Sequence, residues 1–168
     1  MRHTKLLLII ASILLASCAT KELLVPKKGD APVGVDLSGD WVLVGTDGSN
    51  QPKARDTRVY LFLETGKVVK ATQTVDGMFF SYNRSIVEEY RFGEHRTVRI
   101  GEVEAERVSG WEGSAYVVET LDEDGARLIE RWKVNAADQM NRSVMIVARG
   151  ASLMSMTQTF ERVEAQNH

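Results

Sequence analysis

Short segments between recurring turn signals are the feature that most limits how this chain can fold. From Leu37 onward, turns containing glycine, asparagine or aspartate recur roughly 8–16 residues apart. The segments between them are too short for the helices that connect parallel strands, and none sustains an apolar period of about 3.6 residues. No proline follows Pro52, so nothing interrupts a hydrogen-bonded ladder. We therefore expect an all-β fold, an antiparallel up-and-down meander of about eight to ten strands.

The local composition indicates where several of these strands lie. Segments 40–45 and 58–64 are rich in β-branched and aromatic residues, which favour strands. Two hairpins are expected across short turns: 115–121 with 127–134, and 138–149 with 153–163. Because the chain ends in a strand-like segment, the last strand is expected to pair with the first. That pairing would close the sheet into a barrel, or a strongly curved sheet, and protect its edges.

The first 37 residues have a different character. Arg2 and Lys5 precede an apolar run over 6–15, and Leu15-Ala16-Ser17-Cys18 ends it. A charged start, a short apolar core and small residues before a cut are typical of a secretory signal. The run of about ten residues is too short to span a bilayer of roughly 30 Å. Residues 19–37 hold two prolines and mixed charge, which disfavour regular structure.

A cysteine directly after Leu-Ala-Ser resembles the lipobox of bacterial lipoproteins, and Cys18 is the only cysteine. The resemblance implies cleavage before Cys18, a lipid on its sulfur that anchors the protein in the membrane, and acylation of the new amino terminus. Because Ala19 rather than aspartate follows, it also implies the outer membrane, facing the periplasm or the cell surface. The expected organisation is a signal peptide over 1–17, a lipidated N-terminus and flexible tether over 18–37, and one β domain over 38–168.

A second resemblance begins at the first expected strand. Gly39-Asp40-Trp41 forms a Gly-x-Trp at its start, which resembles the pattern of lipocalins and the wider calycins. Further stretches similar to uncharacterised bacterial lipocalin-like proteins are Trp111-Glu112-Gly113, Glu130-x-Trp132 and Phe160-Glu161-Arg162-Val163. The resemblance implies an up-and-down β-barrel that encloses a small apolar ligand.

Trp41 and Arg162 are the residues expected to close the barrel. Trp41 lies early in the first strand and Arg162 late in the last, so antiparallel pairing places them at the same end. The calycin resemblance implies that a basic side chain from the last strand covers the first-strand tryptophan. A guanidinium over an indole contributes on the order of 0.5–2 kcal/mol. The competing arrangement is an open sheet with Arg162 in solvent.

A carboxylate on an apolar face marks a candidate ligand site. Glu130 alternates with Leu128 and Trp132, which places it on their side of the strand. A buried unpaired carboxylate costs several kcal/mol, so we expect a partner, either Arg107 or Arg162. Inside a barrel, such a polar patch would orient the head group of a ligand. The alternatives are a structural ion pair, or a two-faced strand whose charge lies in water.

The candidate ligand-binding residues share an inward position on the expected strands. They are Glu130, Trp132, Arg107, Tyr90 and Met156. Met154 and Met156 share a face and could offer soft ligands to Cu(I), but methionine more commonly fills gaps in a core.

Other chemistries are poorly represented. Residues 1–17 hold two basic and no acidic side chains, which leaves 19 basic and 23 acidic residues and a net charge of −4. This balance provides no basic patch for nucleic acid. After the signal only His95 and His168 remain, so neither a Ser-His-Asp triad nor a zinc cluster is expected. We expect no enzyme, no metal and no cofactor.

Two functions remain open. The first is a lipid-anchored envelope protein that binds a small apolar or amphipathic ligand inside the barrel. The second is a structural or interaction lipoprotein with a filled core, which docks an envelope partner. The contents of the barrel distinguish them, because large side chains can either fill an eight-stranded interior or line a cavity.

Overall fold

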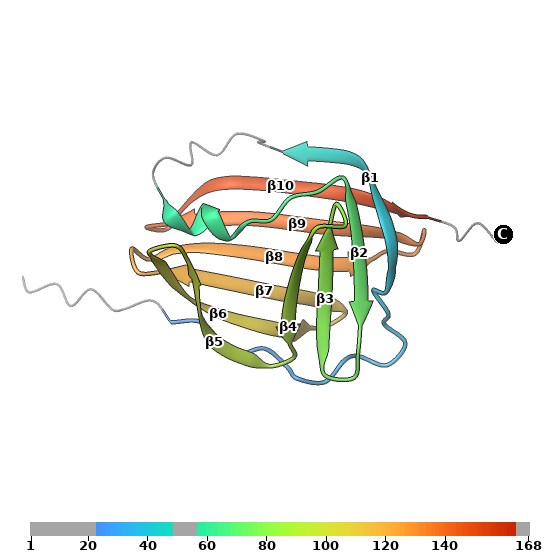
Figure 1. The fold of residues 1–168 in the computed structure, drawn as a ribbon, viewed down its shortest axis with the longest axis horizontal. Helices are drawn as coiled ribbons and strands as arrows, with labels where there is room; N and C mark the ends of the chain where they lie inside the picture. The colour runs from blue at the N-terminus through green and yellow to red at the C-terminus, as the bar shows by residue number, and fades with distance from the viewer. Residues whose placement is uncertain (1–22, 49–56, 164–168) are drawn as a thin grey trace, which may run out of the picture.

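The computed structural model describes residues 23–48 and 57–163, which form ten strands and one 3-10 helix, η3. The elements are β1 (Gly39–Gly48), η3 (Arg58–Phe62), β2 (Val68–Gln73), β3 (Gly77–Tyr82), β4 (Ile86–Arg91), β5 (Glu94–Ile100), β6 (Val103–Glu112), β7 (Ala115–Asp122), β8 (Ala126–Val134), β9 (Gln139–Ala148) and β10 (Ala151–Arg162). Each strand is antiparallel to its neighbours (Figure 1). The all-β meander predicted from the turn spacing is confirmed.

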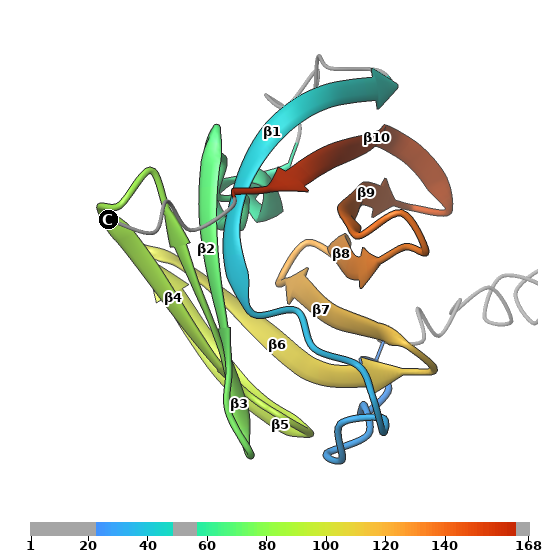
Figure 2. The ribbon, with the colours of Figure 1, turned by 90° about the vertical axis from the view of Figure 1, so that its right-hand side faces the viewer.

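Pairing of the first and last strands turns the meander into a nearly closed barrel. The strand order is β4-β3-β2-β1-β10-β9-β8-β7-β6-β5, with Trp41 of β1 opposite Arg162 of β10. Figure 2 shows the strands curving around a common interior. β4 and β5 are the two edges of this sheet. The Arg96 guanidinium on β5 donates to the Glu89 carbonyl of β4 at 2.7 Å, which links the edges by a side chain.

Two apolar clusters occupy the interior, at opposite ends of strands β6, β8, β9 and β10. The aromatic cluster contains Leu37, Trp41, Val69, Ala71, Met78, Phe80, Tyr82, Tyr90, Trp111, Tyr116, Val118, Trp132, Met140 and Phe160. The aliphatic cluster contains Val59, Phe62, Val103, Ala105, Ala126, Leu128, Val144, Ile146, Met154 and Met156. The strands contribute alternate residues to these clusters because successive side chains point to opposite faces of a sheet; from β5 only the partly buried Val98 packs on the aliphatic cluster.

The strand predicted over 58–64 is wrong, because these residues form η3 and the loop after it. The Thr57 side chain caps the helix by accepting from the Val59 amide at 3.3 Å, and the Asp122 carboxylate accepts from the same amide at 3.0 Å. Val59 and Phe62 are three residues apart, so they lie on one side of a 3-10 helix. Both are buried in the aliphatic cluster. Burial with a period of three overrides the strand propensity of this segment.

Residues 23–37, which we call the strap, lie against the barrel. Leu24 is buried with Val108 and Leu121, and Leu37 is buried in the aromatic cluster. Leu24 and Leu37 therefore find partners on the barrel, whereas Leu23, Val25 and Val33 stay exposed. Cys18 lies outside the described residues.

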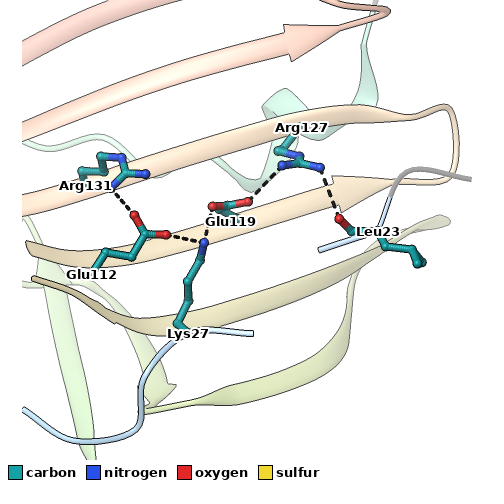
Figure 3. Close-up of polar contacts among 6 residues, drawn as sticks. All are labelled: Leu23, Lys27, Glu112, Glu119, Arg127 and Arg131. Atoms are coloured by element: carbon teal, nitrogen blue, oxygen red, sulfur yellow. Dashed lines mark hydrogen bonds and ion pairs between the residues drawn. The ribbon is translucent and has the colours of Figure 1, made fainter. Parts of the chain in front are cut away.

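Ion pairs on the barrel's outer surface hold the strap (Figure 3). Lys27 Nζ lies 2.5 Å from carboxylate oxygens of both Glu112 and Glu119, and its side chain is only 5% exposed. Two arginines of β8 bind the same carboxylates: Arg131 at 2.5 Å from Glu112 and Arg127 at 3.3 Å from Glu119. We call these five residues the strap network. It joins segments 85 and 92 residues apart in the chain.

The backbone of the strap also needs a glycine beneath it. Lys28 and Trp111 exchange two backbone hydrogen bonds, of 3.3 and 3.0 Å. Gly110, with a φ of 153°, lies under this crossing, and a Cβ there would come 2.5 Å from the Lys28 carbonyl oxygen.

Among residues 23–48 and 57–163, no helix is long and apolar enough to cross a membrane.

Candidate ligand-binding site

Polar side chains separate the two apolar clusters inside the barrel. They come from the inward positions of adjacent strands, between residues of the aliphatic cluster and residues of the aromatic cluster. The members of this polar layer are Glu88 (β4), Arg107 (β6), Thr120 (β7), Glu130 (β8), Arg142 (β9) and Gln158 (β10), joined by the hydroxyl groups of Tyr82 (β3) and Tyr90 (β4), whose rings belong to the aromatic cluster. On β8, for example, Glu130 lies between Leu128 of one cluster and Trp132 of the other. The layer is therefore built by the same alternation that builds the core.

A fully buried ion pair lies at the centre of the layer. Arg142 is 0% exposed, and its Nη2 donates to the carboxylate of Glu130, which is 2% exposed. The guanidinium also donates to the Gln158 side chain at 3.3 Å and lies 4.6 Å from the ring centre of Trp132. Burial alone would lower the pKa of Arg142, but Glu130, together with Tyr82 and Tyr90, outweighs burial and raises this pKa above its ordinary value.

A second, looser pair completes the layer. Arg107 Nη1 lies 3.8 Å from Glu88, and Arg107 Nε donates to the Thr120 hydroxyl at 2.9 Å. The Tyr90 hydroxyl donates to Glu88, and the Arg107 guanidinium lies 5.4 Å from the Tyr90 ring centre. Burial, together with the charge of Glu130, raises the pKa of Glu88. The two glutamates therefore act on each other within one electrostatic unit.

Two hydrogen-bond donors in the layer are buried without a partner among residues 23–48 and 57–163. These are the Tyr82 hydroxyl and Arg142 Nε. The two side chains are neighbours, because the Arg142 guanidinium lies 5.5 Å from the Tyr82 ring centre. Burial raises the pKa of Tyr82, which keeps its hydroxyl protonated. A buried donor without an acceptor costs free energy, so this pair can bind an oxygen atom of a ligand.

A surface hollow of about 270 Å³ shares one lining residue, Gln158, with this layer. It lies where β1 separates from β2, and its lining residues are Leu43, Thr65, Gly66, Lys67, Asn83 and Gln158. Gln158 is 6% exposed and accepts from Arg142. It therefore connects the wall of the hollow to the buried ion pair.

The structure brings the candidate ligand-binding residues together around the layer. Glu130, Arg107 and Tyr90 belong to it, Trp132 packs on its aromatic side, and Met156 lies on its aliphatic side. The expected partner of Glu130 was wrong: Arg142 takes this place rather than Arg107 or Arg162.

Arg142 is the site residue that the sequence reasoning missed. The pattern Met140-Arg142-Val144-Ile146 places an arginine on the apolar face of its strand. That alternation was the available signal.

Trp41 and Arg162 meet at the closing pair of strands. The Arg162 guanidinium lies 4.2 Å from the Trp41 ring centre. It donates to the Ser38 carbonyl at 2.6 Å and to the Asp138 carboxylate at 2.9 and 3.2 Å. The arrangement fastens β1 to β10 outside the polar layer.

Residues with other chemical potential lie elsewhere. His95 is half-exposed, and its Nε2 is 3.0 Å from Glu106. Met154 and Met156 are core residues of the aliphatic cluster. Among the described residues, no three His, Cys, Asp or Glu side chains are grouped to hold a metal ion.

Comparison with known proteins gives structural neighbours only. No family model and no curated protein matches the chain. A secretory abundant heat soluble protein of Ramazzottius varieornatus superposes with a TM-score of 0.55 and 14% identity, covering 77% of this chain and 97% of that chain. The "REP1-NXSQ fatty acid transporter" gives 0.52 and 12%, covering 77% and 98%.

A fatty acid binding protein of Schistosoma mansoni, in complex with arachidonic acid, gives a TM-score of 0.52 and 16% identity, covering 76% and 96%. At such identities the likeness shows the fold alone. The fold is an antiparallel up-and-down β-barrel of the lipocalin-like kind.

Proposed function

We propose that this protein is a non-catalytic binding module for a small amphipathic molecule whose polar head group lies in the polar layer. The observation that carries the proposal is the pair of buried donors, Tyr82 hydroxyl and Arg142 Nε, which lack acceptors among the described residues. Ligand sites are mostly apolar cavities with a few convergent polar groups, and the layer lies between two apolar clusters. The fatty acid binding and transport named for two of the structural neighbours supports the same class of ligand.

The hollow beside Gln158 is the proposed entrance. Gln158 and Leu43 form part of its wall, and Met156 follows Gln158 inward on the same face of β10. Methionine side chains are flexible and adapt to irregular shapes. The Met154 and Met156 side chains can therefore shift to make room for an apolar chain.

Removal of the Tyr82 hydroxyl tests the proposal. The purified protein is titrated with a fluorescent long-chain probe, and binding is followed by its emission. Tyr82→Phe removes only the hydroxyl group, so we expect roughly 5- to 10-fold weaker binding, from a hydrogen bond worth about 1–1.5 kcal/mol. Tyr60→Phe, on η3 and outside the layer, is the matched control. Equal affinity of both variants and the wild type would contradict the proposal.

The filled aromatic end of the barrel supports the second candidate, a structural or interaction protein that docks an envelope partner. Phe80 and Trp132 stack with ring centres 4.4 Å apart, and Tyr116 packs edge-on against Trp111 at 5.4 Å. If this alternative holds, the polar layer serves only to fix how the core packs, and the wild-type protein binds no long-chain probe. The same titration therefore separates the two functions.

We further propose that a lipid on Cys18 anchors the protein in the outer membrane. Support comes from the lipobox-like Leu15-Ala16-Ser17-Cys18 and from the strap. Because the strap is bound to the barrel from Leu23 onward, five residue steps separate it from Cys18, a reach of at most about 17 Å. Such an anchor would keep the barrel close to the lipid. Metabolic labelling with a clickable fatty acid tests this: Cys18→Ala is expected to lose the label, and equal labelling would refute the anchor.

A further inference from the structure

The polar layer is charge-balanced, and this balance bears on which ligands it can accept. It contains two guanidinium groups, of Arg107 and Arg142, and two carboxylates, of Glu88 and Glu130. Each guanidinium already has its own carboxylate: Arg142 donates to Glu130, and Arg107 lies 3.8 Å from Glu88. All four side chains are at most 16% exposed.

An anionic head group would therefore enter a site with no spare positive charge. Its charge would be taken out of water and placed near Glu130 and Glu88, in surroundings where like charges repel more strongly than in water. The arginines could bind it only by giving up their present partners. Leaving a carboxylate buried and unpaired is unfavourable.

A neutral oxygen meets no such obstacle. The unsatisfied groups of the layer are two hydrogen-bond donors, Arg142 Nε and the Tyr82 hydroxyl, on neighbouring side chains. A hydroxyl or ester oxygen can accept from both while the two ion pairs stay intact. The Tyr82 hydroxyl can also accept a hydrogen bond, so it suits a ligand hydroxyl in either direction.

We propose that the barrel selects uncharged amphiphiles, such as long-chain alcohols and glycerol monoesters, over fatty-acid anions, and that Glu130 enforces this selection. The inference rests on the proposed function and narrows its ligand class. Glu130 acts as a specificity residue by neutralising Arg142. Without its carboxylate, Arg142 would offer an unpaired positive charge to a ligand.

The test compares 1-dodecanol with dodecanoate, which share a chain length and differ in the head group. Calorimetric titration at pH 8, where the fatty acid is ionised, is expected to show at least tenfold tighter binding of the alcohol by the wild-type protein. Glu130→Gln keeps the side-chain shape and removes the charge, so it is expected to reverse the preference. Glu112→Gln, the same change in the strap network, is the matched control and should leave the preference unaltered.

Each outcome decides between the two proposals. Equal or tighter binding of dodecanoate by the wild type would overturn the selection of neutral ligands and leave a ligand-binding function standing. Binding of neither compound would overturn the proposed function and, with it, this inference.

If Glu130→Gln is unstable, thermal unfolding replaces titration. Dodecanoate is then expected to raise the melting temperature of the variant more than that of the wild type. An equal rise in both would overturn the role of Glu130.

Discussion

The polar layer inside the barrel and the strap network outside it are built from the same types of charged residue, but they serve different purposes. Inside, Glu130 and Arg142 come from neighbouring strands and are almost completely buried. Outside, Lys27 reaches Glu112 and Glu119 from a segment more than 80 residues away, and Glu112 stays 35% exposed. The outer pairs bring distant segments together, with Lys27 5% and Glu119 7% exposed, while Glu112 keeps contact with solvent. The inner pairs carry a large desolvation penalty and leave two donors without acceptors. This pattern is expected of a binding site rather than of a contact that only holds two segments together.

The largest expected effect comes from breaking the inner pair. Arg142→Met leaves Glu130 buried and uncompensated, so we expect a loss of about 3–5 kcal/mol in the free energy of unfolding. Replacing both partners, Glu130→Leu with Arg142→Met, removes the charges together and is expected to be neutral or stabilising by about 1–4 kcal/mol. Urea denaturation of both variants is the measurement. A double variant as unstable as the single one would show that the pair itself supports the fold.

The outer network should respond more weakly. Lys27→Met keeps the apolar stem and removes two charged hydrogen bonds, but Glu112 and Glu119 retain Arg131 and Arg127. We expect a loss of about 1.5–3 kcal/mol, measured by urea denaturation, with faster hydrogen exchange in the strap. Lys133→Met, at an exposed position of β8, is the control. Unchanged exchange in the strap would mean that Lys27 does not hold it.

Closure of the barrel by Trp41 and Arg162 provides a smaller effect. The guanidinium lies on the ring but stays 35% exposed on its side chain, so we expect Arg162→Met to cost about 0.5–2 kcal/mol. A double-mutant cycle with Trp41→Phe isolates the stacking from the ion pair to Asp138. A coupling energy near zero would show that Asp138 and Ser38 hold Arg162 without help from the ring.

The sequence predicted the barrel better than its site, for physical reasons. Turn spacing and alternation are local, so the meander, the two hairpins and the inward position of Glu130 could all be predicted. The partner of Glu130 depends on strand register, since Arg142 lies diagonally across from it rather than directly opposite. Composition does not reveal strand register. In the folded protein the arginine that pairs with Glu130 is Arg142, rather than Arg107 or Arg162.

Two further features depend on tertiary contacts that a sequence pattern does not carry. The residues of η3 have strand propensity, but Asp122, more than 60 residues later, caps the helix. The strap contains prolines and glycines typical of a linker, but Lys27 finds two carboxylates on β6 and β7. In both cases a distant acidic side chain decides the local structure.

The smallest effect, and the one that sets the two regions apart most directly, is on pH dependence. Burial raises the pKa of Glu88 above its ordinary value of 4.5. Between the ordinary and the raised pKa, the folded state binds more protons than the unfolded state. The contribution of Glu88 to the free energy of unfolding is therefore full below pH 4.5 and is lost as the pH rises through the raised pKa.

The pKa of Glu112 is shifted in the opposite direction. Burial would raise its pKa, but Lys27 and Arg131 outweigh burial and lower it. Its contribution is therefore present above pH 4.5 and is lost as the pH falls through the lowered pKa.

Paired substitutions make the contrast measurable. Glu88→Gln keeps an acceptor for the Tyr90 hydroxyl and removes the ionisation, so the stability of the variant relative to the wild type should rise from acid to neutral pH. Glu112→Gln should lose stability near neutral pH and match the wild type in acid. Urea denaturation at several pH values between about 3 and 8, on both sides of the ordinary glutamate pKa, measures both slopes. Slopes of the same sign would show that Glu88 is stabilised in its ionised form, as Glu112 is. The polar layer and the strap network would then not differ in this respect.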